Sequence, residues 1–160
     1  MAVDLIYKMR RTEEYDVDDN GFFLVDSLAS ALRELPLMRR ERGNLGAAKL
    51  VVKVLLRRCL YFGLMRHGEL VSSGVLALGH CRFYAVGPEA IVIGEIATAA
   101  ASRGQGYATW TVMLAINRMI RAGSTVFYID TQRRNTPMIR SIEKLGFGPP
   151  IGGDAAGIGP

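Results

Sequence analysis

The stretch from residue 96 to residue 108, Ile-Ala-Thr-Ala-Ala-Ala-Ser-Arg-Gly-Gln-Gly-Tyr-Ala, carries residue types suited to binding an anion. Gly104 and Gly106 stand between an apolar run typical of a buried strand and a longer apolar segment of helical length. Glycines at such a joint let backbone N–H groups approach a ligand closely, and a helix that starts there adds its positive dipole end. The joint therefore suits a phosphate group such as a pyrophosphate.

Two common phosphate-binding motifs do not match this joint. A P-loop requires Gly-Lys followed by Ser or Thr, which the sequence lacks, and the dinucleotide fingerprint requires a third small residue where this chain has Thr109. The pattern that remains is Arg103-x-x-Gly106-x-Ala108.

This pattern resembles the acetyl-CoA pyrophosphate loop of the GNAT superfamily of N-acetyltransferases, which has the form Arg/Gln-x-x-Gly-x-Gly/Ala. A second similarity lies downstream, where residues 135–147 end in Leu-Gly-Phe, like the last helix of that superfamily. Together the two motifs extend the resemblance over about residues 90–147.

The resemblance implies an N-acetyltransferase that uses acetyl-CoA as co-substrate, holds no metal, and transfers the acetyl group by direct attack of an amine. Acetyl-CoA is expected in a V-shaped opening between the strands that end at Thr98 and Asp130, with its pantetheine arm paired to the first of them. Asn135 is expected either to bond the pantetheine or to cap a helix. The expected cofactor-binding residues are Ile96, Thr98, Arg103, Gly104, Gln105, Gly106, Tyr107, Ala108 and Asn135.

The candidate catalytic base is Glu95, the only carboxylate between Ala90 and Ile129. Because successive strand residues face opposite sides, Glu95 points away from Ile96 unless a bulge intervenes, so a salt bridge or a turn-facing role is the competing interpretation. Many members of the superfamily carry a tyrosine in the last helix, five residues before the closing Phe, as a general acid. Here that position is Ile142, so transfer without this acid is expected.

The elements that must position these residues follow from periodicity and turn signals. Residues 3–9 favour an edge strand with Leu5, Tyr7 and Met9 on one face. Two amphipathic helices are expected next, over about 24–35 with Pro36 closing it, and over about 45–60 with Asn44 as its cap. Short apolar runs at 61–65, 70–78 and 82–86 then predict an antiparallel meander.

The second half predicts a parallel pair of strands joined by a helix. A strand over 90–98 leads into the glycine joint, a helix ends at Gly123, and a buried strand covers 125–130. A last helix is expected to have Thr136 as its cap, Pro137 at its first position, and Gly146 at its end. The predicted fold class is mixed α/β, with a mixed sheet flanked by helices, which matches the GNAT layout.

The length of 160 residues favours a single domain. Together with the resemblance, this implies one GNAT-like acyltransferase domain over residues 1–148. Residues 149–160, rich in Gly, Pro and Ala, are expected to be disordered. The superfamily usually adds a hairpin after Leu-Gly-Phe, for which this tail is a poor candidate. Completion of the sheet by a partner chain, and hence a homodimer, is therefore an open alternative.

The composition indicates a folded basic protein, with 49% hydrophobic residues and a net charge of +5. A basic chain favours an acidic partner, which CoA and nucleic acid both satisfy. No membrane span or signal peptide is expected, and two cysteines without zinc-type spacing indicate reduced thiols in a cytoplasmic protein.

Three functions remain open at this stage. The first is an N-acetyltransferase acting on a small-molecule or peptide amine. The second is a catalytically weak or inactive module that binds an acyl-CoA. The third is a nucleic-acid-binding domain, which ranks lowest because no recognition motif accompanies the arginine clusters.

Overall fold

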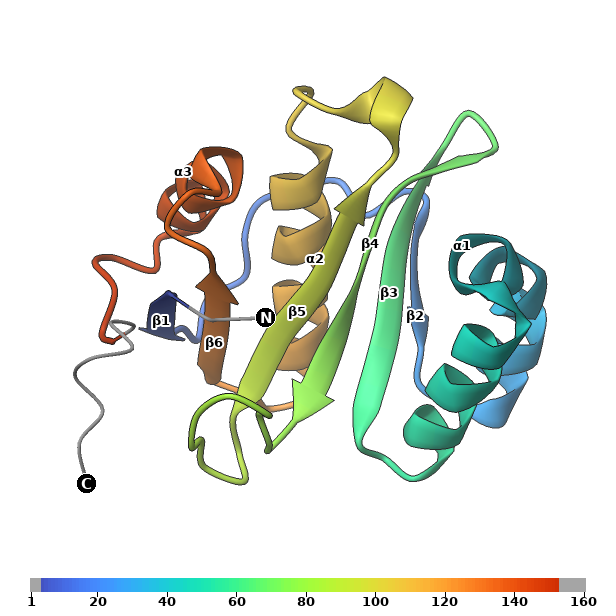
Figure 1. Cartoon of the computed structure of the whole chain (residues 1–160), viewed down its shortest axis with the longest axis horizontal. Coiled ribbons are helices and arrows are strands. Elements are labelled where there is room, and N and C mark those ends of the chain that lie inside the picture. Colours follow the sequence, from blue (N-terminus) through green and yellow to red (C-terminus); the bar gives the residue numbers. More distant parts are fainter. Residues whose placement is uncertain (1–3, 153–160) are drawn as a thin grey trace.

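A computed structural model describes residues 4–152 and shows a six-stranded sheet flanked by α-helices (Figure 1). The strands are β1 (Leu5–Arg10), β2 (Phe22–Val25), β3 (Cys59–Arg66), β4 (Glu69–Leu78), β5 (Ile91–Thr98) and β6 (Val126–Thr131). The α-helices are α1 (Leu28–Leu55), α2 (Tyr107–Arg121) and α3 (Thr136–Leu145), and a short 3-10 helix, η1, spans Ala100–Ser102. The chain is therefore mixed α/β, as predicted.

The strands lie in the order β1-β6-β5-β4-β3-β2, and β1 is an edge strand, as its sequence predicts. All neighbouring pairs are antiparallel except β5 and β6, which run parallel and are joined through α2. The predicted strand–helix–strand crossover is thus present. It brings the carboxyl ends of β5 and β6 to the same edge of the sheet, where ligands of α/β proteins commonly bind.

The helices cover opposite faces of the sheet. Leu60 and Phe62 of β3 pack in the core with residues of α2 and α3, while the alternating Cys59 and Tyr61 pack with residues of α1. Because adjacent strand residues point to opposite sides, α1 lies on one face and α2 and α3 lie on the other. The side that carries α1 is called the α1 face below.

Helix α1 contains both predicted N-terminal helices, separated by a break at Gly43, where φ is 73°. Pro36 lies inside the first half, so the expectation that it closes the helix is wrong. The second half ends at Leu55, and Leu60 belongs to β3, so the predicted boundary at residue 60 is also wrong.

Three further expectations differ from the structure. Residues 22–25 form β2, although the apolar spacing from Leu24 predicts a helix, because these residues pair with β3. Residues 82–86 form a loop and not a third strand of the meander. Asn135, not Thr136, is the N-cap of α3, and its side chain accepts a hydrogen bond from Met138 N at 3.3 Å.

The segment after α3 returns to the sheet edge. Ile151 N donates to Ile6 O and Ile6 N donates to Gly152 O, each at 2.8 Å, so the start of the tail that the sequence marks as disordered pairs with β1. Residues 153–160 and the first residue of the predicted strand 3–9 lie outside the described residues. Across residues 4–152, none of the helices is both long and apolar enough to cross a membrane.

Candidate active site

The strand β5 contains a bulge near its carboxyl end. Val75 of β4 pairs with Gly94 and Ser73 pairs with Ala97, so Glu95 and Ile96 stand opposite Gly74 alone. Glu95 has φ of 51°, an unusual conformation for a residue with a side chain. A bulge inserts one extra residue and bends its strand, which re-aims the side chains that follow.

The strands β5 and β6 part next to this bulge. Their parallel pairing runs from Ile91 and Phe127 to Ile93 and Ile129 and extends no further. Beyond it lies a cavity of about 370 Å³, here called the donor cleft. Its lining comes from both strands and from the start of α3, and comprises Ile93, Gly94, Glu95, Ile96, Asp130, Thr131, Gln132, Arg134, Asn135 and Met138.

A turn with two left-handed glycines connects β5 to α2 (Figure 1, yellow). Gly104 has φ of 76°, and Gly106, the N-cap of α2, has φ of 80°. A Cβ added to either glycine would meet no other atom within 4 Å, so the open side of the turn is not filled by the described chain. The first N–H groups of an α-helix have no partners inside the helix, so the start of α2 offers free donors next to this turn. The turn is here called the amide cradle.

The side chains in the amide cradle contribute unequally. Gln105 Nε2 donates back to Ala101 O at 3.3 Å, and the Tyr107 ring stacks on Trp110 with centroids 6.2 Å apart. Arg103 is exposed and makes no ion pair with any described residue. The cradle therefore offers backbone amides and one free guanidinium.

Glu95 lies on the α1 face despite the bulge. Arg42 Nη1, at the break in α1, donates to Glu95 Oε2 at 3.2 Å, which is the salt bridge that competes with a catalytic role. The Glu95 side chain is 63% exposed. It still borders the donor cleft, so the structure places Glu95 at the site but not free of a partner.

Asp130, at the carboxyl end of β6, is a second carboxylate beside the donor cleft. Tyr84 of the loop before β5 donates its hydroxyl to Asp130 Oδ2 at 2.9 Å. Burial raises the pKa of the Asp130 carboxyl, although the Tyr84 hydrogen bond acts in the opposite direction. Burial and the nearby Asp130 charge raise the pKa of the Tyr84 hydroxyl, so Tyr84 stays protonated and keeps donating.

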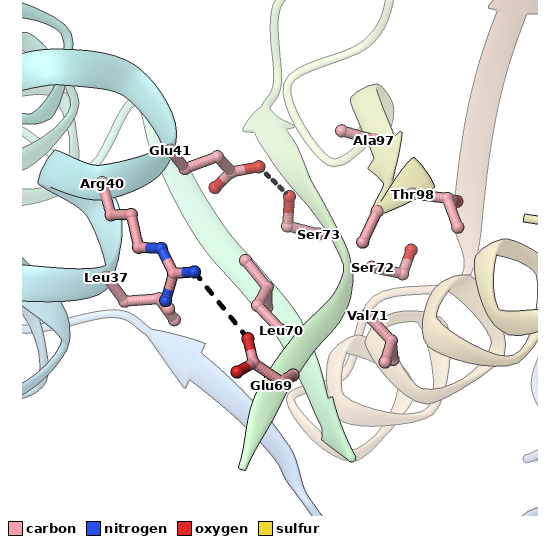
Figure 2. A pocket seen from close by; sticks show the side chains of 11 residues that line it. Leu37, Arg40, Glu41, Glu69, Leu70, Val71, Ser72, Ser73, Ala97 and Thr98 are labelled. Carbon is pink, nitrogen blue, oxygen red and sulfur yellow. Dashed lines mark hydrogen bonds and ion pairs between the residues drawn. The ribbon is translucent and has the colours of Figure 1, made fainter. Parts of the chain in front are cut away.

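Two further cavities adjoin the sheet. The first, of about 320 Å³, lies between α1 and the ends of β4 and β5 (Figure 2). In it the Glu41 carboxylate accepts hydrogen bonds from the hydroxyls of Ser73 and buried Tyr61, and Arg40 Nη2 lies 3.9 Å from Glu69 Oε2. Its lining and that of the donor cleft have no residue in common.

The other cavity, of about 450 Å³, lies below the bulge on the α1 face. It shares Ile93, Gly94, Glu95 and Asp130 with the donor cleft. The two spaces therefore meet where β5 and β6 part. This cavity is here called the lower cavity.

The sequence predicts neither a tyrosine acid at position 142 nor a metal ion. Ile142 is 0% exposed in the core between α3 and the sheet, so the position that commonly holds a tyrosine acid does not border the cleft. Within residues 4–152, no group of His, Cys, Asp and Glu side chains is arranged to hold a metal ion.

Residues 53–147 match the Acetyltransferase (GNAT) family, which is more than half of the chain. The chain belongs to the GNAT acetyltransferase family. A comparison with curated proteins gave no match.

Solved structures agree with this family at the level of the fold. A GNAT-family protein from Novosphingobium aromaticivorans DSM 12444 has 19% identity and a TM-score of 0.60, with 93% of this chain and 61% of that chain covered. AAC(6')-Iy bound to a CoA bisubstrate analogue has 14% identity and a TM-score of 0.59, with 79% and 90% covered. A ribosomal-protein-alanine N-acetyltransferase from Brucella melitensis biovar Abortus 2308 has 18% identity and a TM-score of 0.56, with 81% and 91% covered.

Coverage differs among these structures. The chain spans 61% of the Novosphingobium protein and 52% of a GNAT-family acetyltransferase from Colwellia psychrerythraea. The shared fold confirms the predicted mixed sheet with its parallel pair.

Proposed function

We propose that residues 1–148 form one acyltransferase domain that moves an acetyl group from acetyl-CoA to an amine. The observation that carries the proposal is the parting of β5 and β6 beside the bulge at Glu95, with the amide cradle at the far end of the same strand. Acetyl-CoA carries a thioester on a long pantetheine arm and a pyrophosphate. It therefore needs both a cleft for the arm, such as the donor cleft, and an anion site, such as the amide cradle. The structures of AAC(6')-Iy with CoA support the assignment by analogy of fold.

The residues present fit the cofactor. Gly104 and Gly106 leave open space where side chains would stand, and Gly94 does the same inside the donor cleft. A pyrophosphate would accept hydrogen bonds from the amides of residues 104–108 and would lie near the Arg103 guanidinium, at the positive end of α2. Bound there, acetyl-CoA would supply the activated acetyl group.

The unpaired side of β5 would hold the pantetheine arm. After Ile93, β5 keeps its pairing to β4 but loses its pairing to β6, so the backbone groups of Ile96 and Thr98 are candidates to hydrogen-bond an added extended chain. Asn135 accepts from Met138 N with its carbonyl oxygen, which leaves its NH₂ group for the arm. Both expected uses of Asn135 are therefore compatible.

The chain must then take a proton from the attacking amine. The nitrogen forms a bond to the acetyl carbon, the carbon–sulfur bond breaks, the proton passes to a carboxylate, and the thiolate leaves. Asp130 is the stronger candidate base, because burial raises its pKa and no residue within 4–152 donates a hydrogen bond to its Oδ1, whereas Glu95 is held by Arg42. An N–H group of β5 would stabilise the negative charge on the carbonyl oxygen.

Calorimetry with CoA, followed by thiol release from acetyl-CoA with a panel of amines, tests the proposal. Binding together with thiol release that depends on an amine is the expected result. Binding without transfer to any amine would favour the second candidate, an acyl-CoA-binding module, which the exposed ion pair on Glu95 and the buried Ile142 keep open. Failure to bind CoA would overturn both.

A further inference from the structure

The lower cavity is where an acceptor can reach the donor cleft. The two spaces share Gly94, Glu95 and Asp130 at the point where β5 and β6 part, whereas the cavity of Figure 2 shares no lining with the cleft. An acceptor that enters from the α1 face would therefore meet the acetyl group at the upper end of the lower cavity.

That upper end is acidic. Glu95 and Asp130 both face the lower cavity, one from each of the two parting strands. Each has one partner, Arg42 for Glu95 and the Tyr84 hydroxyl for Asp130. A protonated amine would be stabilised between the two carboxylates before it loses its proton.

The opposite end of the lower cavity is basic. Lys53 lies in the last turn of α1, Arg58 lies just before β3, and Arg82 lies in the loop after β4. None of the three forms an ion pair with a described residue. Arg58 N donates to Lys53 O at 2.9 Å and Arg58 O accepts from Leu78 N at 3.0 Å, so Lys53 and Arg58 lie beside the pair Cys59 and Ala77, and Ala77 pairs with Val92, three residues before Glu95 on β5. A strand rises about 3.3 Å per residue, so the two ends are separated by roughly 10 Å along β5.

Apolar side chains line the space between the ends. Leu50, Cys59, Val75, Val92 and Phe83 contribute to the wall of the lower cavity. This wall suits a short chain of methylene groups, which would be removed from water there.

We propose that the lower cavity binds an acceptor that carries an anionic group, a carboxylate or a phosphate, at some distance from its amine. The amine lies at Glu95 and Asp130, and the anion lies among Lys53, Arg58 and Arg82. The role of the amine rests on the proposed acetyl transfer. The anion site does not depend on that transfer and can be tested without it.

The anion site is tested without any acetyl transfer through Cys81, which also lines the lower cavity and is partly exposed. The other cysteine, Cys59, is removed as Cys59→Ala, and the rates of reaction with an anionic and a cationic methanethiosulfonate reagent are compared. The same thiolate attacks both reagents, forming a mixed disulfide and releasing methanesulfinate, so the ratio of the two rates reports the local potential. Because of the three cations, the ratio of the anionic-reagent rate to the cationic-reagent rate is expected to be about tenfold or more higher at Cys81 than for free β-mercaptoethanol.

Charge-reversal variants make this test specific. Lys53→Glu, Arg58→Glu and Arg82→Glu are each expected to lower the ratio, and Lys49→Glu, on α1 but outside the cavity lining, serves as the matched control. A ratio equal to that of β-mercaptoethanol, or one that Lys49→Glu lowers as much as the other three variants, would overturn the proposal.

Matched acceptors test the complete proposal once CoA binding is established by calorimetry. The pairs are ε-aminocaproate with hexylamine, lysine with cadaverine, and phosphoethanolamine with ethanolamine. The anionic member of at least one pair is expected to have a kcat/KM about tenfold higher, and Arg82→Glu is expected to reduce that ratio; the phosphate pair distinguishes the two anions. Preference for cadaverine and hexylamine would overturn the inference while the acetyltransferase function stands, and absence of CoA binding would instead overturn the function.

Discussion

Arg42 Nη1 lies 3.2 Å from Glu95 Oε2, and this ion pair joins the break in α1 to the bulge in β5. Both residues occupy irregular backbone, since Arg42 precedes Gly43 with its φ of 73° and Glu95 has φ of 51°. The guanidinium also lies 5.5 Å from the centroid of the Tyr61 ring. The pair therefore ties the helix that covers the α1 face to the strand that borders the donor cleft.

The carboxylate that serves as base can be identified by comparing Glu95→Gln with Asp130→Asn. General base catalysis is typically worth about 10²- to 10⁴-fold, so kcat is expected to fall by that range in Asp130→Asn and by less than about tenfold in Glu95→Gln. CoA affinity by calorimetry is the control, and neither change is expected to alter it by more than about threefold. The opposite order of the two kcat values would assign the base to Glu95.

The charge of Asp130 also affects stability. Burial raises the pKa of the Asp130 carboxyl in the folded protein above its ordinary value of about 3.9. The folded protein therefore binds the carboxyl proton more tightly than the unfolded chain, and ionisation of Asp130 lowers the free energy of unfolding. The cost is absent below the unfolded pKa and complete above the folded one. Asp130→Asn is therefore expected to unfold at higher urea concentration than wild type at pH ~7, with the difference shrinking toward pH ~3.5.

Tyr84→Phe keeps the Asp130 carboxyl but removes the hydrogen bond that it accepts, so it tests how that bond affects the pH dependence of stability. The Tyr84 hydroxyl stabilises the ionised form of Asp130, so its removal is expected to shift the same pH dependence to higher pH. A wild-type stability that does not differ from Asp130→Asn at any pH would show that the carboxyl titrates normally.

The amide cradle is tested by Gly106→Val, with Gly123→Val at the other end of α2 as the matched control. Both glycines have positive φ, 80° and 97°, and open space around the missing Cβ, so both variants carry a similar backbone strain of about 1–2 kcal/mol. Only Gly106 borders the expected pyrophosphate. A loss of one charge-assisted hydrogen bond is worth about 1.5–3 kcal/mol, so CoA affinity is expected to fall about 10- to 100-fold in Gly106→Val alone.

Equal CoA affinities for the two variants in calorimetry would place the pyrophosphate elsewhere. Arg103→Glu adds an independent measurement, because it replaces an exposed cation by a carboxylate and leaves the backbone unchanged. The new negative charge would repel the pyrophosphate, so CoA affinity is expected to fall.

The sequence predicts the parts of the site that depend on local backbone chemistry. Gly106 and Gly146 cap helices with left-handed conformations, and a strand ends at Thr98, because these features depend on the residue itself and its neighbours. The predicted faces of β1 are also correct, since Leu5, Tyr7 and Met9 are buried together.

The features that the sequence does not reveal depend on distant partners. Residues 22–25 have helical apolar spacing, yet they form a strand because β3 offers an edge to pair with. Asp130 lies one residue beyond the stretch in which Glu95 is the only carboxylate, and its importance follows from the parallel strand that ends beside it. The rule that ligands bind beyond the carboxyl ends of parallel strands is the signal that could have identified Asp130.

Ile142 provides a test of the core, because its side chain is fully buried and does not line the donor cleft. The side chain is fully buried among residues of the sheet and α2, so Ile142→Tyr is expected to overpack the core and cost about 1–3 kcal/mol. Ile142→Val, which only shortens the side chain, is expected to cost about 0.5–1.5 kcal/mol. Urea unfolding measures both, and a Tyr variant as stable as wild type with a raised kcat would show that position 142 reaches the cleft.

The contact between the end of the described chain and β1 gives the last prediction. Ile6, buried on the edge strand, donates to Gly152 O and accepts from Ile151 N, both at 2.8 Å. Each backbone hydrogen bond is worth about 0.5–1.5 kcal/mol net, so a chain that ends at Pro150 is expected to lose about 1–3 kcal/mol of unfolding free energy. A chain that ends at Gly152 retains both bonds and is the matched control.

Hydrogen exchange locates the effect. The amide of Ile6 is expected to exchange faster in the chain that ends at Pro150 than in the chain that ends at Gly152, because its acceptor is gone. CoA affinity is expected to stay the same in both, since the donor cleft lies between β5 and β6 and no residue of 148–152 lines it. Equal stability of the two truncated chains, with equal exchange at Ile6, would show that this pairing contributes nothing to the fold.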